Sequence, residues 1–226
     1  TIPLKPLTYS ISSPVKILVF NMKDLHGQGF LQERTINSLN TYLVLDNYDL
    51  CFDIGVNVGG FINAYYDKFK KIVGLEAHPL TYEFAKKNLN SYNNVLLLNN
   101  AAYHSDDEEL NLFIFENENS GSTSILNSIP NSQCKDELNT TKSISYETLV
   151  KKYGTPQYIK IDIEGGEYDF LFGKDLSGVE FLSMELHTNF LSEEKRKHLK
   201  KHLLKFFNIY SEKQGKYHPE INFIKK

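Results

Sequence analysis

The stretch YIKIDIEGGEYDFL, residues 158–171, carries three acidic side chains directly after a strand-like apolar run. Asp162 and Glu164 are two positions apart, so on an extended strand end their side chains share one side. Glu167 follows three positions later, one turn along the helix that the next residues predict. One interpretation is a simple helix start, because acids at a helix N-terminus stabilise its dipole by about 0.3–1 kcal/mol. The other is that these carboxylates do chemistry.

A second polar pair follows the next apolar run, VEFLSMEL, because Glu185 and His187 are again two positions apart. Carboxylates and imidazoles are the usual general bases of enzymes, and carboxylates also bind divalent cations. The alternative is that both residues are structural, with Glu185 a strand-end acid whose hydrogen bonds are made within the protein. The pair is therefore a candidate for catalysis or metal binding, together with the acids of the first stretch.

A third motif, CFDIGVNVGGF, is typical of a strand that turns into a helix around a ligand. Gly55 and Gly59 would let the backbone approach that ligand closely. A dinucleotide fingerprint needs a second glycine where this chain has Asn57, and that glycine makes room for a pyrophosphate. The motif instead suits a ligand with an amino-acid end, with Asp53 facing an ammonium group and the glycine turn and Asn57 holding a carboxylate. S-adenosyl-L-methionine has both groups.

Two further strand ends carry residues that suit the rest of such a ligand. Glu76 ends the next predicted strand, where an acid can accept hydrogen bonds from two ribose hydroxyls. Asn100 and Ala101 end the third, where a carboxamide and a small side chain suit the edge and face of an adenine. Because ligands of open α/β sheets bind at the carboxyl ends of the strands, these residues predict one cofactor site.

The elements that must position these residues alternate as strand, helix, strand, which predicts a parallel sheet covered on both faces. ELNLFIF then predicts an antiparallel strand, and the polar residues 116–142 predict a long lid-like insertion. Apolar spacing predicts a helix over residues 29–45, after an N-terminal extension or cap of residues 1–29. We expect one main domain over residues 30–226, ending in a β-hairpin.

Composition narrows the class of partner. The chain has 226 residues and a net charge of −3, which disfavours nucleic acid because phosphate binding favours a basic face. No apolar run is long enough to span a bilayer. Two cysteines without a close spacing indicate a reducing compartment, so we expect a cytoplasmic protein. The chain does not begin with Met, which leaves open that it is a domain of a larger glycan-assembly protein.

The motifs FDIGVNVGGF, GLEAHP, NNAAY, NSGSTSI, YIKIDIEGGEYDFLFG and LSMELH, in this order, resemble the FkbM-type family of S-adenosylmethionine-dependent methyltransferases. The resemblance implies a Rossmann-like class I methyltransferase fold, a mostly parallel seven-stranded sheet with helices on both faces and an antiparallel last strand. It implies O-methylation of a sugar hydroxyl in a glycan, glycolipid or glycosylated metabolite. Its cofactor residues map onto one set: Asp53, Gly55, Asn57, Gly59, Glu76, Asn100 and Ala101.

In that fold the two strands that carry the acidic pairs are neighbours, so the pairs should converge on one cleft. We assign catalysis or acceptor contact first to Asp162, then to Glu164 and His187, and regard Glu167 as the acid with the strongest structural alternative. Carboxylates this close would raise some pKa values and prepare a general base, or bind a divalent metal ion. The alternatives are methylation of a non-sugar natural product, an NAD-dependent sugar-modifying oxidoreductase, and a catalytically silent binding domain.

Overall fold

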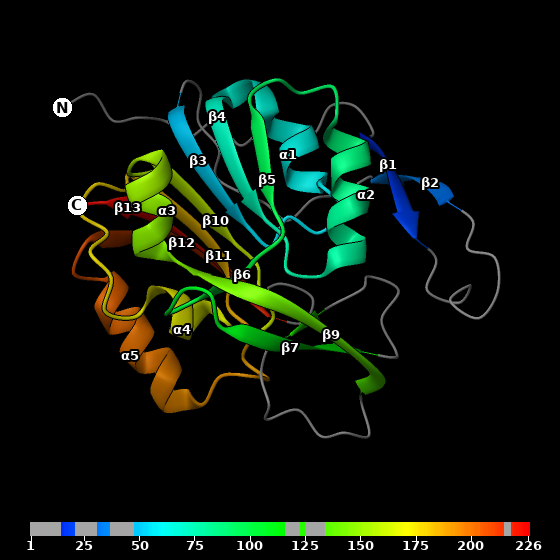
Figure 1. The fold of residues 1–226 in the computed structure, drawn as a ribbon. Coiled ribbons are helices and arrows are strands. Elements are labelled where there is room, and N and C mark those ends of the chain that lie inside the picture. The colour runs from blue at the N-terminus through cyan, green and yellow to red at the C-terminus, as the bar shows by residue number, and fades with distance from the viewer. Residues whose placement is uncertain (1–14, 21–30, 37–47, 116–122, 125–133, 215–217) are drawn as a thin grey trace.

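The computed structural model describes residues 15–20, 31–36, 48–115, 123–124, 134–214 and 218–226. At its centre is a seven-stranded sheet (Figure 1). In spatial order its strands are β12 (Phe207–Gln214), β13 (Pro219–Lys225), β11 (Phe181–Glu185), β10 (Tyr158–Ile161), β3 (Tyr48–Ile54), β4 (Phe69–Leu75) and β5 (Val95–Leu98).

The direction of the last strand is the distinctive feature of this sheet. Neighbouring strands from β11 to β5 run parallel, whereas β13 lies between β11 and β12 and is antiparallel to both. This confirms the predicted α/β fold and the predicted final hairpin. It is the topology of the class I methyltransferases.

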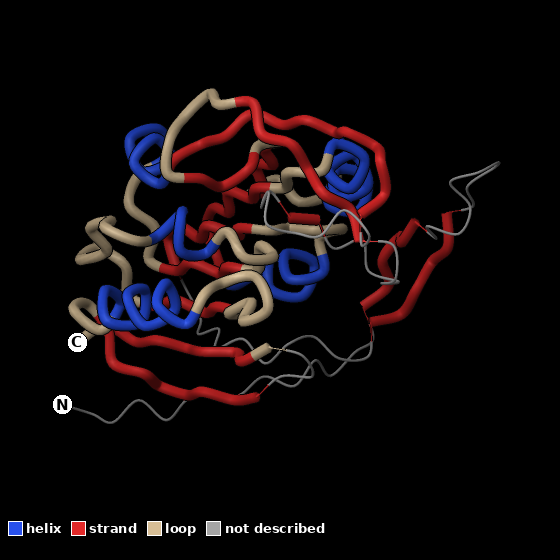
Figure 2. The backbone as a smooth tube through the Cα atoms, turned by 90° about the horizontal axis from the view of Figure 1, so that it is seen from below, coloured by secondary structure: helices blue, strands red, loops and turns tan. Residues whose placement is uncertain are grey.

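Helices cover both faces of the sheet (Figures 1 and 2). Their bounds are α1 (Gly60–Tyr65) with the 3₁₀ turn η2 (Tyr66–Lys68), α2 (Pro79–Leu89), α3 (Tyr146–Tyr153), α4 (Glu167–Leu171) and α5 (Glu193–Leu203). One buried cluster joins the sheet to α1 and α2, through residues such as Ile62 and Leu89. The other joins it to α3, α4 and α5, through residues such as Leu149 and Phe170. Because both faces are buried, the strands are almost continuously apolar.

A second, smaller sheet lies next to the carboxyl end of β5, where the chain runs directly into β6 (Ala101–Tyr103) (Figure 1). Its spatial order is β6, β9 (Cys134–Ser145), β7 (Glu109–Phe115) and β8 (Thr123–Ser124). β7 is antiparallel to β9, as its alternation predicted. Within the predicted lid-like insertion over residues 116–142, β8 and β9 are strands that both pair with β7, and the role of the insertion as a lid stays a prediction. Residues 116–122 and 125–133 of that insertion lie outside the described residues.

The N-terminal part contains a strand pair, β1 (Val15–Phe20) and β2 (Leu31–Ile36), which pair in antiparallel fashion. The helix predicted over residues 29–45 is therefore wrong at residues 31–36; residues 37–45 lie outside the described part. The apolar spacing behind that prediction has a gap between Leu31 and Ile36, and β1 supplies the backbone partner that the sequence pattern does not show. The predicted boundary at residue 29 stays a prediction. Within the described residues, none of the helices combines the length and apolar character that a membrane crossing requires.

The end of β3 lies very close to the end of β10, and Gly55 makes this approach possible. Its φ of 85° lies in the left-handed region, and an added Cβ would lie 1.9 Å from the backbone oxygen of Asp162. Asp162 N in turn donates to Ile54 O at 2.9 Å. Any side chain at position 55 must therefore separate the two strand ends.

We expect Gly55→Ala to destabilise the protein more than Gly173→Ala. Gly173 has a similar φ of 84°, yet an added Cβ meets nothing within 4 Å. The control therefore measures backbone strain alone, about 1–2 kcal/mol. The clash should add at least about 2 kcal/mol to the loss at position 55. Urea unfolding of both variants measures the difference, and equal losses would contradict the described approach of the strands.

Candidate active site

The predicted site residues gather at the carboxyl ends of four neighbouring parallel strands. Asp53 lies in β3, Glu76 directly follows β4, Asp162 directly follows β10, and Glu185 ends β11. In the sheet β3 and β10 are neighbours, with β4 beyond β3 and β11 beyond β10. The side chains of β3 and β4 therefore lie on one side of the boundary between β3 and β10, and those of β10 and β11 lie on the other. The site thus has two halves, which meet between Asp53 and Asp162.

Lys160 joins the two halves, and the sequence analysis assigned it no role. It lies within β10, its side chain is 4% exposed, and its Nζ is 3.2 Å from Asp53 Oδ1 and 3.9 Å from Asp162 Oδ2. It also donates to Gly55 O at 2.6 Å. Burial works to lower the pKa of Lys160, but the charges of Asp53 and Asp162 outweigh it and raise the pKa above its ordinary value. Lys160 is therefore a buried ammonium bound to both halves.

Asp53 is fully buried beneath this ammonium. Burial raises the pKa of its carboxyl to about 6, although the charge of Lys160 works in the opposite direction. Neither oxygen accepts a hydrogen bond from the described residues, so the ion pair is its main compensation. The sequence did carry a signal of this ion pair, because Lys160 lies in the middle of an apolar strand and a buried lysine almost always needs an acidic partner.

The loop after β3 holds its shape through its own amides. Gly55 N and Val56 N both donate to Leu75 O, and Gly59 N donates to Val56 O. Val58 N donates to the side-chain oxygen of Asn57, which has a φ of 53°. These amides were expected to approach a ligand, but the structure uses them within the chain. Gly59 caps α1 at a φ of 96°, and a Cβ there would press on Leu89.

Glu76 is the residue of this half that best fits a diol. Its two oxygens accept from Asn57 N at 2.8 Å and from His78 N at 2.9 Å. Each oxygen keeps a further lone pair, and both are fixed in place. Burial raises the pKa of Glu76 to about 7, against the effect of the two backbone hydrogen bonds.

The end of the third strand holds Asn99 besides the predicted Asn100 and Ala101, whose adenine contact stays a prediction. Asn99, which the sequence analysis left out, donates from Nδ2 to Glu76 O and Ala77 O at 2.9 and 3.0 Å, so it ties the ends of β4 and β5 together. Asn100 donates to Lys142 O at 3.1 Å, and Ala101 is buried in β6. Asn99 and Asn100 are adjacent in the sequence, and nothing in the pattern distinguishes them.

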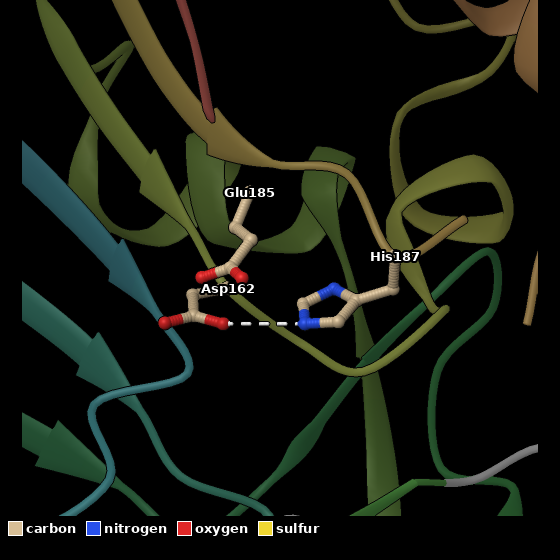
Figure 3. Close-up of side chains that lie close together, drawn as sticks. All are labelled: Asp162, Glu185 and His187. Atoms are coloured by element: carbon tan, nitrogen blue, oxygen red, sulfur yellow. Dashed lines mark ion pairs between the residues drawn. The ribbon is translucent and has the colours of Figure 1, made fainter. Parts of the chain in front are cut away.

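The other half of the site is centred on His187, which is 2% exposed (Figure 3). Its Nδ1 lies 2.5 Å from Glu167 Oε1, and its Nε2 lies 3.3 Å from Glu164 Oε2 and 3.7 Å from Asp162 Oδ1. The predicted convergence of these residues is therefore present. Burial works to lower the pKa of His187, but its hydrogen bond to Glu167 and the charges of Glu167, Glu164 and Asp162 raise it to about 10. The imidazole is accordingly protonated at neutral pH.

Glu185 completes this half, because a ligand atom from each of Asp162, Glu185 and His187 lies within 4.8 Å of the other two (Figure 3). Burial raises the pKa of Glu185 to about 7, and the charge of Asp162 adds to the shift. The side chains of Asp162 and Glu164 are 29% and 22% exposed. Glu167, by contrast, is fully buried behind His187. The exposed acids are thus the ones that a substrate can reach.

Comparison with known proteins identifies the family. The family model described as the methyltransferase FkbM domain matches residues 53–218, well over half of the chain. The chain therefore belongs to the FkbM family of S-adenosylmethionine-dependent methyltransferases. Among curated protein sequences, none matches the chain.

Solved structures agree on the fold. A methyltransferase FkbM from Methylobacillus flagellatus KT matches with a TM-score of 0.51 at 14% identity, over 77% of this chain and 43% of that one. A fibrillarin pre-rRNA processing protein from Methanococcus jannaschii matches with a TM-score of 0.52 at 11% identity, over 81% of this chain and 69% of that one. The present chain thus spans less than half of the Methylobacillus protein. At these identities the likeness shows the fold alone.

We expect Lys160→Met to destabilise the protein by about 3–5 kcal/mol, because it leaves Asp53 buried without a partner charge. The double variant Lys160→Met with Asp53→Asn should recover most of this loss. The control Lys195→Met breaks a partly exposed pair with Asp169 and should change little, because water screens that pair. Chemical unfolding measures all three, and a loss at Lys160 no larger than the control would rule out the buried ion pair.

The stability of the Lys160→Met variant should depend on pH in a specific direction. An acid whose pKa is raised on folding binds its proton more tightly in the folded state, so its contribution to stability falls as pH rises above the unfolded value of 3.8. The pKa of Asp53 is already about 6 with Lys160 present. The stability difference between Lys160→Met and the double variant should therefore be smaller at pH 5 than at pH 8. A difference independent of pH would contradict an ionised Asp53.

Proposed function

We propose that the chain is an S-adenosylmethionine-dependent O-methyltransferase that acts on a sugar hydroxyl of a glycan, glycolipid or glycosylated metabolite. The observation that carries the proposal is the carboxylate–histidine cluster at the ends of β10 and β11, next to the glycine loop and Glu76. Carboxylates suit an acceptor with several hydroxyl donors, and a net charge of −3 disfavours a polyanionic one. We place the protein in the cytoplasm, a reducing compartment, because its two cysteines have no close spacing.

The residues of the first half fit the cofactor. Glu76 presents two fixed carboxylate oxygens, each already holding one backbone N–H and each able to accept a ribose hydroxyl. Asn57 is exposed at the loop, where it can reach the amino-acid end. Asp53 is buried on Lys160, so we assign it support of the loop rather than direct contact. S-adenosylmethionine would supply a methyl group activated by a sulfonium charge.

The residues of the second half would handle the acceptor. Asp162 and Glu164 are the partly exposed acids, and they can align a hydroxyl and accept its proton. His187 is buried and positively charged, so we assign it the positioning of these two carboxylates instead of proton abstraction. Glu167 fixes the histidine from behind. Of the sequence assignments, Asp162 remains the first choice for acceptor contact.

The cofactor assignment predicts that S-adenosylhomocysteine stabilises the protein, by about 2.7 kcal/mol at a hundredfold excess over its Kd. Glu76→Gln should weaken this binding, because one oxygen of the diol acceptor is replaced by a donor. Glu83→Gln, which removes an exposed acid of α2, is the matched control and should bind like the wild type. Calorimetry measures the affinities. Equal binding by both variants would reject the role of Glu76.

The binding should also depend on pH in a stated direction. The ionised form of Glu76 accepts hydroxyl donors better, so binding favours that form and lowers a pKa of about 7. Affinity for S-adenosylhomocysteine should therefore fall as pH drops from 8 to 6, with proton release on binding near pH 7. This dependence should weaken in Glu76→Gln. A dependence that is the same in both proteins would assign the proton to another group.

The acceptor assignment is tested by turnover. Mass spectrometry of sugars, non-sugar hydroxyl compounds and RNA incubated with S-adenosylmethionine identifies the accepted class. With that acceptor, Asp162→Asn should lower the rate about 100-fold or more while cofactor affinity is kept. Asp169→Asn, in α4, removes an acid that pairs with Lys195 and should be neutral. Unchanged turnover in Asp162→Asn would reject its role, and methylation of RNA alone would reject the sugar acceptor.

A further inference from the structure

We infer that Asp162, Glu185 and His187 form a binding site for one divalent cation of the Mn²⁺ type, which holds the acceptor oxygen (Figure 3). The inference deepens the proposed function and rests on it for the role of the ion, while the binding site itself stands on the geometry. It concerns three residues from two neighbouring strands.

The backbone brings the ligand atoms to one level. β10 and β11 are parallel, and their last paired residues are Ile161 and Met184. Asp162 and Glu185 are the next residues on each strand, so their carboxylates leave the sheet side by side. The side chain of His187, two positions after Glu185, points back toward both carboxylates (Figure 3). The resulting ligand atoms lie within 4.8 Å of one another, which a single ion can span after small side-chain rotations.

Glu167 is a separate observation that points to a ligand at His187. Metal-bound histidines almost always give their other ring N–H to a carboxylate or carbonyl group, which fixes the ring and its tautomer. Here Glu167 Oε1 lies 2.5 Å from Nδ1, so Nε2 is the nitrogen that faces the acids. Glu167 is fully buried, and its Oε2 accepts no hydrogen bond from the described residues. Glu167 thus fixes this histidine from behind the cluster and outside the ligand set, while its Oε1 also accepts from Gly165 N at 3.2 Å.

The ligand set also indicates the kind of ion. Two carboxylates and one imidazole suit first-row divalent ions that take both oxygen and nitrogen ligands, of which Mn²⁺ serves as the probe, whereas Ca²⁺ and Mg²⁺ prefer oxygen ligands throughout. Binding requires the neutral imidazole, so the ion takes the place of the Nε2 proton. Three protein ligands leave coordination positions open, as catalytic sites do. An acceptor hydroxyl in such a position would lose its proton more easily. Glu164 Oε2, 3.3 Å from Nε2, borders the same space.

The test is Mn²⁺ binding to the full chain at pH 8, without cofactor or acceptor, followed by electron paramagnetic resonance. We expect one bound ion with a Kd below about 1 mM. A ¹⁴N coupling from His187 should appear in the pulsed spectrum. Asp162→Asn, Glu185→Gln and His187→Gln should each weaken binding by about 100-fold, and His187→Gln should abolish the ¹⁴N coupling.

Glu220→Gln is the matched control. Glu220 lies opposite Glu185 on β13 and contributes negative charge there, yet it is outside the ligand set. It should weaken binding by no more than about fivefold, the scale of an outlying charge. Glu167→Gln should weaken binding about tenfold or more with the ¹⁴N coupling altered, which a merely structural role would not produce.

Absence of one-to-one binding, binding without a ¹⁴N coupling, or equal losses in Glu220→Gln and Glu185→Gln would each overturn the metal site. The readout needs neither methyl transfer nor S-adenosylhomocysteine, so its failure is distinct from failure of the proposed function. Conversely, Mn²⁺ binding with no methyl acceptor found would leave the site standing and reject its assigned role.

Discussion

The buried ammonium of Lys160 is the interaction on which the site depends. It lies inside a sheet covered on both faces, where an unpaired charge would cost several kcal/mol. Asp53 in β3 and Asp162 directly after β10 compensate it, and Gly55 O accepts a hydrogen bond from its Nζ. The same group thus fixes the start of the glycine loop and the position of the first acid after β10. Gly55 permits this because no Cβ separates the two strand ends.

From this junction the two halves of the site acquire different properties. On the β3–β4 side, hydrogen bonds within the chain use the loop amides, and the acceptors that remain for a ligand are the buried, fixed oxygens of Glu76. On the β10–β11 side, His187 carries a positive charge among three acids, with Glu167 buried behind it. One half is a fixed acceptor of hydroxyl donors, and the other is a cluster of carboxylates around one cation, His187 or a metal ion. Both properties suit the proposed methyl transfer to a hydroxyl.

Sequence patterns predicted the order of strands and helices over residues 48–115, 146–214 and 218–226 well, because apolar periodicity directly reflects burial on a two-faced sheet. They also placed the acids at strand ends, since position along the strand is local information. They missed Lys160, whose partner Asp53 is distant in sequence, although a lysine inside YIKID was a usable signal. They also missed β2 and β9, because strand pairing with β1 and β7 is non-local. They did not distinguish Asn99, which ties the ends of β4 and β5 together, from its neighbour Asn100.

The proposed function places the cofactor on the β3–β4 half of the site, with its sulfur at the acids after β10 and β11 that would handle the acceptor. The most direct test is a crystal structure of the protein with S-adenosylhomocysteine bound. The account predicts ribose hydroxyls on Glu76, the amino-acid end beside Asn57, and the sulfur facing the cleft of Asp162 and Glu164. A ligand whose sulfur faces away from these two acids, or a ribose that does not contact Glu76, would contradict it.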